Sequence, residues 1–136
     1  WSGTLELVDI PADFKSEMAD LLPDFISPGN PVDLSAQAGN AEYVDALEAA
    51  FLHDVCDLAI VGITPNEKLD DELVTGLADL SRRFARPVVT YLKGSGLREK
   101  MTRKLGSVGI PAYPSVGRAV NAAGVYMAWH KRAGGR

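Results

Sequence analysis

Two continuous apolar runs constrain the fold more strongly than any other feature of the sequence. Residues 59–63 read Ala-Ile-Val-Gly-Ile and residues 87–92 read Pro-Val-Val-Thr-Tyr-Leu, and segments with helical spacing of apolar residues separate and follow them. Parallel strands that are buried on both faces have this continuous apolar character, because neither face meets water. Alternation of such strands with helices is typical of βαβ units. We therefore predict an α/β domain with strands at 57–63 and 88–92 in a parallel sheet.

The spacing of apolar residues also predicts five helices and two further strands. The helices are expected over residues 13–22, 40–53, a segment containing 69–80, 94–108 and a segment that follows 115, and the strands over 5–10 and 112–113. The second and last helices start beside good N-cap residues, Asn40 and Ser115.

The start of the third helix has two candidate positions. Thr64-Pro65-Asn66-Glu67 matches a capping box with proline at the first helical position. Asp70 offers a cap for a later start. In either case the helix carries an apolar stripe that should pack on the sheet, formed by Leu69, Leu73, Leu77 and Leu80.

Length and composition fit one globular domain. The 136 residues are 46% hydrophobic and 24% charged, and we expect residues 1–132 to form the domain and 133–136 a tail or linker. The net charge of −4 argues against nucleic acid as a partner, and no apolar run approaches the roughly 20 residues of a membrane span. These features predict a cytoplasmic protein. Cys56 is the only cysteine, which excludes an internal disulfide and a Cys-based zinc site, and we interpret it as a small buried hydrophobic residue.

Two candidate sites follow strands directly, where open parallel sheets bind ligands. Thr64, Pro65 and Asn66 follow the first apolar run, and the free amides of a helix N-terminus there would favour an anion. Gly94 and Ser95 follow the second run in a turn whose composition resembles a phosphate cradle, although it lacks the spacing of a Walker A loop. The ordinary alternatives are a capped helix and a glycine-containing turn.

Other polar residues have simpler interpretations. Asn30 and Asp33 flank a proline in a loop and either fasten that loop or line a ligand site. His53 and His130 lie towards the ends of predicted helices, where the helix dipole favours imidazolium, and no pattern near them builds a catalytic triad. We interpret the acidic run of residues 70–72 as an exposed first helical turn rather than a metal site.

These segments, in this order, resemble the NDP-forming acyl-CoA synthetases, the superfamily that contains succinyl-CoA ligase and ADP-forming acetyl-CoA synthetase. The most specific part is Gly29-Asn30-Pro31-Val32-Asp33-Leu34. The resemblance continues through residues 41–52, 57–63, 64–65, 86–89, 109–113 and 118–120. It implies the second of two flavodoxin-like ligase domains, with three α/β/α layers.

The resemblance also implies a mechanism. In that family ATP or GTP phosphorylates a histidine on a mobile loop, an acyl phosphate forms, and CoA displaces the phosphate to give a thioester. Two helix N-termini, one from each ligase domain, hold the phosphohistidine. By this resemblance Thr64, Pro65 and Asn66 face the phosphate, while Asn30 and Asp33 shape the loop around it.

The same resemblance implies that this domain is inactive alone and has no catalytic residue or bound cofactor of its own. The family histidine lies in a Ser-His-Thr-Gly segment, which this sequence lacks. ATP or GTP, Mg and CoA are therefore expected to bind to partner domains or subunits of an oligomer. These partners are the CoA-binding, histidine-bearing ligase and ATP-grasp domains.

The family pattern is matched only from its second strand onward, so we expect the first βα unit of the domain to come from another chain or a separate segment. A different class of function also fits the resemblance, namely a structural or ligand-sensing domain, as in members fused to an acetyltransferase. A receiver or flavin-binding domain is disfavoured, because the first strand and loop that would carry its site do not occur here.

Overall fold

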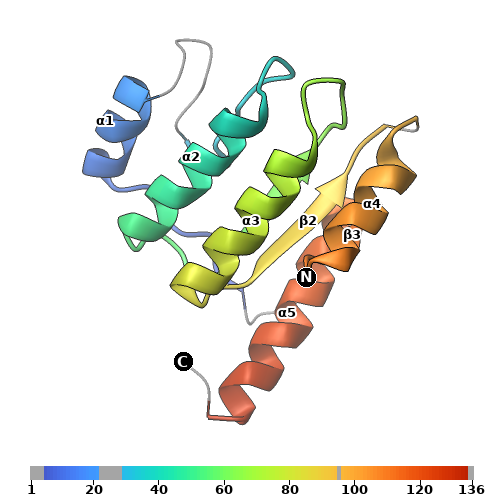
Figure 1. Cartoon of the computed structure of the whole chain (residues 1–136). Helices are drawn as coiled ribbons and strands as arrows, with labels where there is room; N and C mark the ends of the chain where they lie inside the picture. The colour runs from blue at the N-terminus through green and yellow to red at the C-terminus, as the bar shows by residue number, and fades with distance from the viewer. Residues whose placement is uncertain (1–4, 22–28, 95, 135–136) are drawn as a thin grey trace.

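The computed structural model describes residues 5–21, 29–94 and 96–134. Its centre is a parallel sheet of three strands in the order β1-β2-β3, with β1 at Ala59–Ile63, β2 at Val88–Leu92 and β3 at Ala112–Tyr113. The sheet lies between helices, so the predicted α/β class with a parallel sheet is confirmed (Figure 1). The arrangement is that of part of a flavodoxin-like domain.

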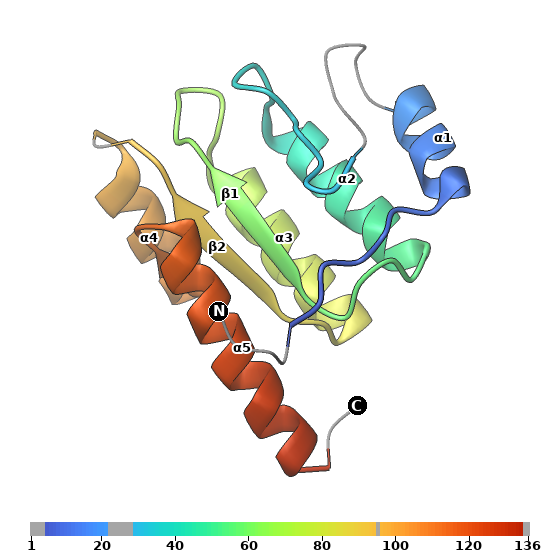
Figure 2. The same ribbon diagram turned by 180° about the vertical axis from the view of Figure 1, so that it is seen from behind.

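The helices form unequal layers on the two faces of the sheet. Helices α2 (Asn40–Leu52), α3 (Asp71–Phe84) and α4 (Arg98–Ser107) lie on one side, and α5 (Val116–Arg132) lies on the other (Figures 1 and 2). Helix α1 (Ala12–Leu21) packs against α2 and away from the sheet. None of the helices in the described ranges is long and apolar enough to cross a bilayer.

The main core lies between the sheet and the layer of helices that contains α3. Leu73 and Leu77 are fully buried there, together with Ile63 of β1 and Leu92 of β2. All four leucines of the predicted stripe are buried, which confirms that this face of α3 packs on the sheet. Burial of a leucine side chain contributes about 1.5–3 kcal/mol, so this stripe is the main link between helix and sheet.

Helix α5 closes the opposite face with small residues. Ala119 and Ala123 are fully buried against Val89 of β2. Ser115 caps the helix as predicted, because its hydroxyl oxygen accepts a hydrogen bond of 3.3 Å from the amide of Arg118. Small side chains on this face allow the helix to approach the sheet closely.

Two of the predicted elements differ from the structure. Residues 5–10 form no strand, and the carbonyl oxygen of Val8 accepts a hydrogen bond from the Asn30 side chain at 2.8 Å instead of joining a ladder. Helix α4 begins at Arg98 rather than near Gly94, whose φ of +83° is a left-handed conformation incompatible with a helix. Leu97 therefore precedes the helix and is 45% exposed, whereas Met101 and Leu105 within α4 are buried.

Candidate functional site

The loop that follows β1 contacts the loop of residues 29–39, which precedes α2. The loop that follows β1 and the loop of residues 29–39 lie at the same edge of the molecule (Figure 1). Lys68 Nζ donates to the Gln37 carbonyl oxygen at 3.3 Å. The side chain of Asn40 donates to Asp70 at 2.7 Å and accepts from the Asp70 amide at 3.1 Å. Gly94 lies at the end of β2, and Ser95 lies outside the described residues.

The helix after β1 starts later than the capping-box pattern suggests. Helix α3 begins at Asp71 and is capped by Asp70, whose carboxylate accepts from the Glu72 amide at 2.9 Å. The later of the two predicted starts is therefore confirmed, and the earlier one is wrong. Asn66 explains this outcome, because its side-chain oxygen accepts from the Lys68 amide at 2.8 Å and forms a turn before the helix.

The α3 N-terminus is consequently a poor anion site. The Asp70 side chain accepts from the Glu72 amide, and Asp71 and Glu72 lie in the first turn as predicted for this acidic run. Lys104 pairs with Asp71 at 2.5 Å, and this hydrogen bond lowers the pKa of the Asp71 carboxyl. A phosphate at these amides would be repelled by the carboxylates. Because α3 begins only at Asp71, Thr64, Pro65 and Asn66 lie in the loop before the helix and not at its N-terminus.

Asn30 and Asp33 both fasten the 29–39 loop. Asn30 ties it to the main chain of Val8, and the Asp33 carboxylate accepts from the Ser35 amide at 2.9 Å. The Asp33 bond spans two residues, which is the geometry of an Asx turn. These contacts agree with the fastening role among the two interpretations of this loop.

Two residues of this edge have no signal in the sequence. Tyr43 of α2 is half-buried beside Thr64, and burial raises the pKa of its phenol, while the main chain of Thr64 partly offsets that rise. Tyr91 of β2 covers Gly62, where a Cβ atom would lie 2.5 Å from the tyrosine ring. Both contacts join residues that are about 20 or more positions apart, so local spacing does not predict them.

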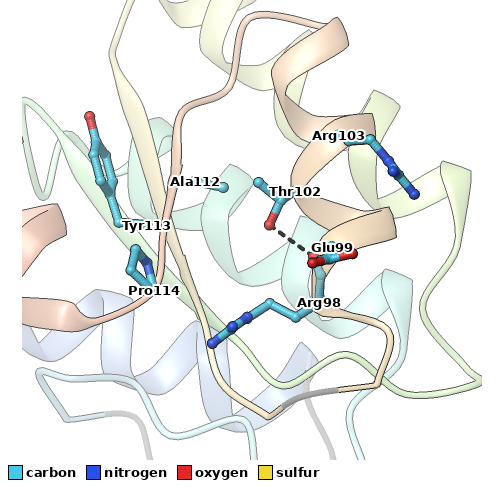
Figure 3. Close-up of a pocket in the computed structure, with 7 residues that line it drawn as sticks. All are labelled: Arg98, Glu99, Thr102, Arg103, Ala112, Tyr113 and Pro114. Carbon is cyan, nitrogen blue, oxygen red and sulfur yellow. Dashed lines mark hydrogen bonds between the residues drawn. The ribbon is translucent and has the colours of Figure 1, made fainter.

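A shallow pocket of about 440 Å³ lies between α4 and β3 (Figure 3). Arg98 and Arg103 contribute to its lining, together with Glu99 and Thr102. The Thr102 hydroxyl donates to the Arg98 carbonyl oxygen at 2.8 Å, which completes a bond within the helix. Figure 3 shows the two guanidinium groups pointing in different directions, so they do not converge on one anion.

The histidines and the cysteine occupy structural positions. His130 stacks on Tyr126 within α5 at a ring-centroid distance of 5.8 Å. Cys56 is half-buried against the main core, and burial raises the pKa of its thiol. The cysteine is thus a core-contacting residue, although it is less buried than the sequence predicts.

His53 ends α2 and joins it to α1. Its Nδ1 atom lies 3.3 Å from the Asp13 carboxylate, and its Nε2 atom bonds to the Glu17 carboxylate. The bond to Glu17 is the main cause that raises the pKa of His53 above 6.5. A histidine with a raised folded-state pKa stabilises the fold fully below its unfolded pKa of about 6.5 and loses that contribution as pH rises through the folded value.

The docking of α1 should therefore weaken at alkaline pH. We expect the denaturant concentration at the unfolding midpoint of the wild type to decrease as pH rises above about 6.5 and through the raised pKa of His53. His53→Gln should flatten this dependence, because glutamine does not titrate. His130→Gln leaves His53 and its carboxylates in place and should keep the slope. Equal slopes for wild type and His53→Gln in chemical denaturation would contradict the assignment.

The fold defines a class of protein: an α/β domain whose parallel sheet and helices are those of part of a flavodoxin-like fold. No family model matches the chain, but individual relatives do. The chain is 27% identical over 118 residues to the alpha subunit of ADP-forming acetate–CoA ligase I of Pyrococcus furiosus. This match covers 83% of the chain and 25% of that relative.

Solved structures agree with that relationship in fold. The protein PH0766 of Pyrococcus horikoshii OT3 matches with a TM-score of 0.76 and 22% identity over 93% of this chain and 30% of its own. The dinucleotide forming acetyl-coenzyme A synthetase 1 of Ca. Korarchaeum cryptofilum, solved apo and with phosphate and ADP, matches with a TM-score of 0.75 and 22% identity over 93% of this chain and 28% of its own. The resemblance to NDP-forming acyl-CoA synthetases is thus confirmed, and the chain spans 25–30% of the length of these relatives.

Proposed function

We propose that this chain is a domain of an NDP-forming acid–CoA ligase and that its carboxyl edge holds the loop that carries the phosphohistidine. The observation that carries the proposal is the 118-residue sequence match to an ADP-forming ligase subunit. The fold match to a synthetase solved with phosphate and ADP supports it. Other domains or subunits would supply the histidine, the sites for ATP or GTP with Mg, and the CoA site, so the isolated domain would be inactive.

The loop after β1 has donors suited to this role. Asn66 already uses its side-chain oxygen to accept from Lys68, while its Nδ2 group makes only a long bond of 3.3 Å to the Thr64 carbonyl oxygen. This amide could turn towards a phosphoryl oxygen without breaking the turn. Lys93, exposed at the end of β2, adds positive charge at the same edge of the sheet.

The neighbouring loops would shape the same surface. Asn30 and Asp33 fix the 29–39 loop, which contacts the loop after β1 through Lys68. Gly94 turns the chain after β2 with a φ of +83°, a conformation that favours glycine. The carboxylates at the start of α3 would direct a bound phosphate away from that helix and towards Asn66.

Asn66→Asp in the full assembly tests the proposal. Aspartate keeps an oxygen that accepts from the Lys68 amide, so the turn should survive, but it removes the Nδ2 donor and adds a negative charge. Loss of one hydrogen bond to a charged group costs about 1.5–3 kcal/mol, so we expect phosphohistidine retention and acyl-CoA formation to fall about tenfold or more.

Asn121→Asp on the exposed surface of α5 is the matched control, because it introduces the same charge away from this edge. Its rates should equal those of wild type. Unchanged rates for Asn66→Asp would count against the site. A wild-type assembly that never autophosphorylates would instead favour the ligand-sensing alternative.

A further inference from the structure

Val88, the first residue of β2, directs its main-chain amide and carbonyl groups towards the side of the sheet where β3 lies. The Ala59 amide donates to the Pro87 carbonyl oxygen at 3.1 Å, so the odd-numbered residues of this stretch bond to β1. The even-numbered residues therefore face β3, and the Thr90 amide donates to the Pro111 carbonyl oxygen at 2.9 Å. Val88 belongs to the same even-numbered set, two positions before Thr90.

The segment before β3 does not complete this ladder. In the register of β2 and β3 the Val88 carbonyl group would accept from residue 111, but Pro111 has no amide hydrogen. The Val88 amide would donate to Gly109, but Gly109 turns with a φ of +81° and the Ile110 amide bonds back to the Leu105 carbonyl oxygen at 2.9 Å. Neither main-chain group of Val88 has a hydrogen-bond partner on this side within the described residues.

Val88 lines a cavity of about 370 Å³ between the amino ends of β2 and β3 and the middle of α5. The residue is only 2% exposed, and buried main-chain groups without a partner are rare and costly. Tyr113, Ala122 and Tyr126 also line the cavity, and none of its described lining residues carries a charge. The Ser81 hydroxyl in the lining is already committed, since it donates to the Arg86 carbonyl oxygen at 2.7 Å.

Tyr126 brings an ordered aromatic ring to this cavity. The ring stacks on His130 at a centroid distance of 5.8 Å and contacts Trp129 at 6.5 Å. Both partners follow Tyr126 along α5, whereas Ala122 precedes it by about one helical turn and lines the cavity. A flat ligand in the cavity would therefore extend an aromatic stack that the helix has already ordered.

We propose that this cavity binds a neutral, planar nitrogen heterocycle that carries an amino group beside a ring nitrogen, as adenine and cytosine do. The Val88 amide would donate to the ring nitrogen, and the amino group would donate to the Val88 carbonyl oxygen. A donor next to an acceptor on one residue selects the complementary pair on the ligand. The ring of Tyr126 selects a flat aromatic ligand, and the uncharged lining selects a neutral one.

This cavity is separate from the proposed phosphate-binding edge. It lies at the amino ends of the strands, whereas the loop after β1 lies at their carboxyl ends, at the opposite end of the sheet (Figures 1 and 2). The inference therefore does not rest on the proposed function. Water is the competing occupant of the cavity, because a water molecule can also bond to an unpaired amide or carbonyl group.

Titration of adenosine and cytidine into the intact protein, labelled with ¹⁵N-valine, tests the proposal. The Val88 amide resonance should shift with either nucleoside, and it reports this cavity even if a nucleoside also binds elsewhere. Purine riboside keeps the ring nitrogens but lacks the amino group, so it should bind at least about fivefold more weakly than adenosine. Equal affinity for purine riboside would overturn the proposal. An unchanged Val88 resonance with both nucleosides at about 10 mM would also overturn it, because the cavity would then hold water only.

Tyr126→Ala provides a second measurement. Stacking of a base on an aromatic side chain is lost, so the affinity for adenosine measured at Val88 should fall at least about fivefold. The side chain is 42% exposed, and the fold should survive its truncation. Val125→Ala on the same helix, 70% exposed and outside the lining, should keep the wild-type affinity.

Unchanged affinity in Tyr126→Ala would overturn the proposal. Asn66→Asp lies at the other end of the sheet and should leave the Val88 shift intact. The two ideas therefore fail separately, because phosphorylation tests Asn66 and nucleoside binding at Val88 tests this cavity.

Discussion

Leu77→Ala should lower the free energy of unfolding by about 2–5 kcal/mol. Leu77 lies in the middle of α3, is fully buried and belongs to the cluster that joins α3 to β1, β2 and α4. Truncation removes three carbon atoms from this cluster and leaves a cavity that neighbours on several elements cannot fill together. Because domains of this size are stable by only about 5–15 kcal/mol, the variant should lose a large share of its stability.

Leu52→Ala is the matched control for this measurement. Leu52 ends α2 and is 63% exposed, so the same truncation there should change stability by no more than about 0.5 kcal/mol. Urea denaturation followed by circular dichroism would measure both variants against wild type, with attention to a constant slope. A loss below about 1 kcal/mol for Leu77→Ala would show that the α3 stripe is not the main link in this core.

The sheet and its main helix could be predicted because their signal is local. A strand that is buried on both faces needs a continuous apolar run, and both long strands have one. The stripe of α3 repeats at helical spacing, which specifies both the element and the face that packs. The short strand at 112–113 and the cap at Ser115 were predicted for the same reason, since each depends on residues within a few positions.

Helix starts were harder to predict because several side chains compete for the same amides. Asn66 and Asp70 both suit a cap, and Asn66 formed a turn of its own, which left Asp70 to begin α3. At α2 the prediction of Asn40 as the cap is wrong. Gly39 takes that position, its amide donating to the Glu42 carboxylate at 2.8 Å, and Asn40 is free to bond with Asp70.

The surroundings of the candidate site could be predicted only in part. Topology places Asn66 at the carboxyl end of β1, but the 29–39 loop, which contains Asn30, follows no strand in the described residues and meets the loop after β1 through Lys68. Long-range pairs are different, because Lys68 with Gln37 and His53 with Glu17 are each more than 30 residues apart. No local pattern encodes such pairs.

Gly76→Ala should destabilise the chain, although alanine is the better helix former. Gly76 lies where α3 crosses α2, and an added Cβ atom would lie 2.6 Å from Val44 Cγ2. Such overpacking costs about 1–3 kcal/mol, whereas the gain in helix propensity from glycine to alanine is about 1 kcal/mol. The cost of the clash should exceed the gain in helix propensity, and we expect the free energy of unfolding to fall by up to about 2 kcal/mol in urea denaturation.

Val44→Ala allows the clash to be separated from helix propensity. With Val44 shortened, the methyl group at Gly76 meets no γ carbon, so Gly76→Ala should become neutral or stabilising by up to about 1 kcal/mol. The same substitution would then change sign between the two backgrounds, and the double-mutant cycle should give a coupling energy of about 1–3 kcal/mol. Equal effects in both backgrounds would show instead that Val44 moves aside at no cost. The glycine would then not set the distance between α2 and α3, and the packing of α2, which carries Asn40 and Tyr43 to the carboxyl edge, would have to depend on Leu47 and Phe51.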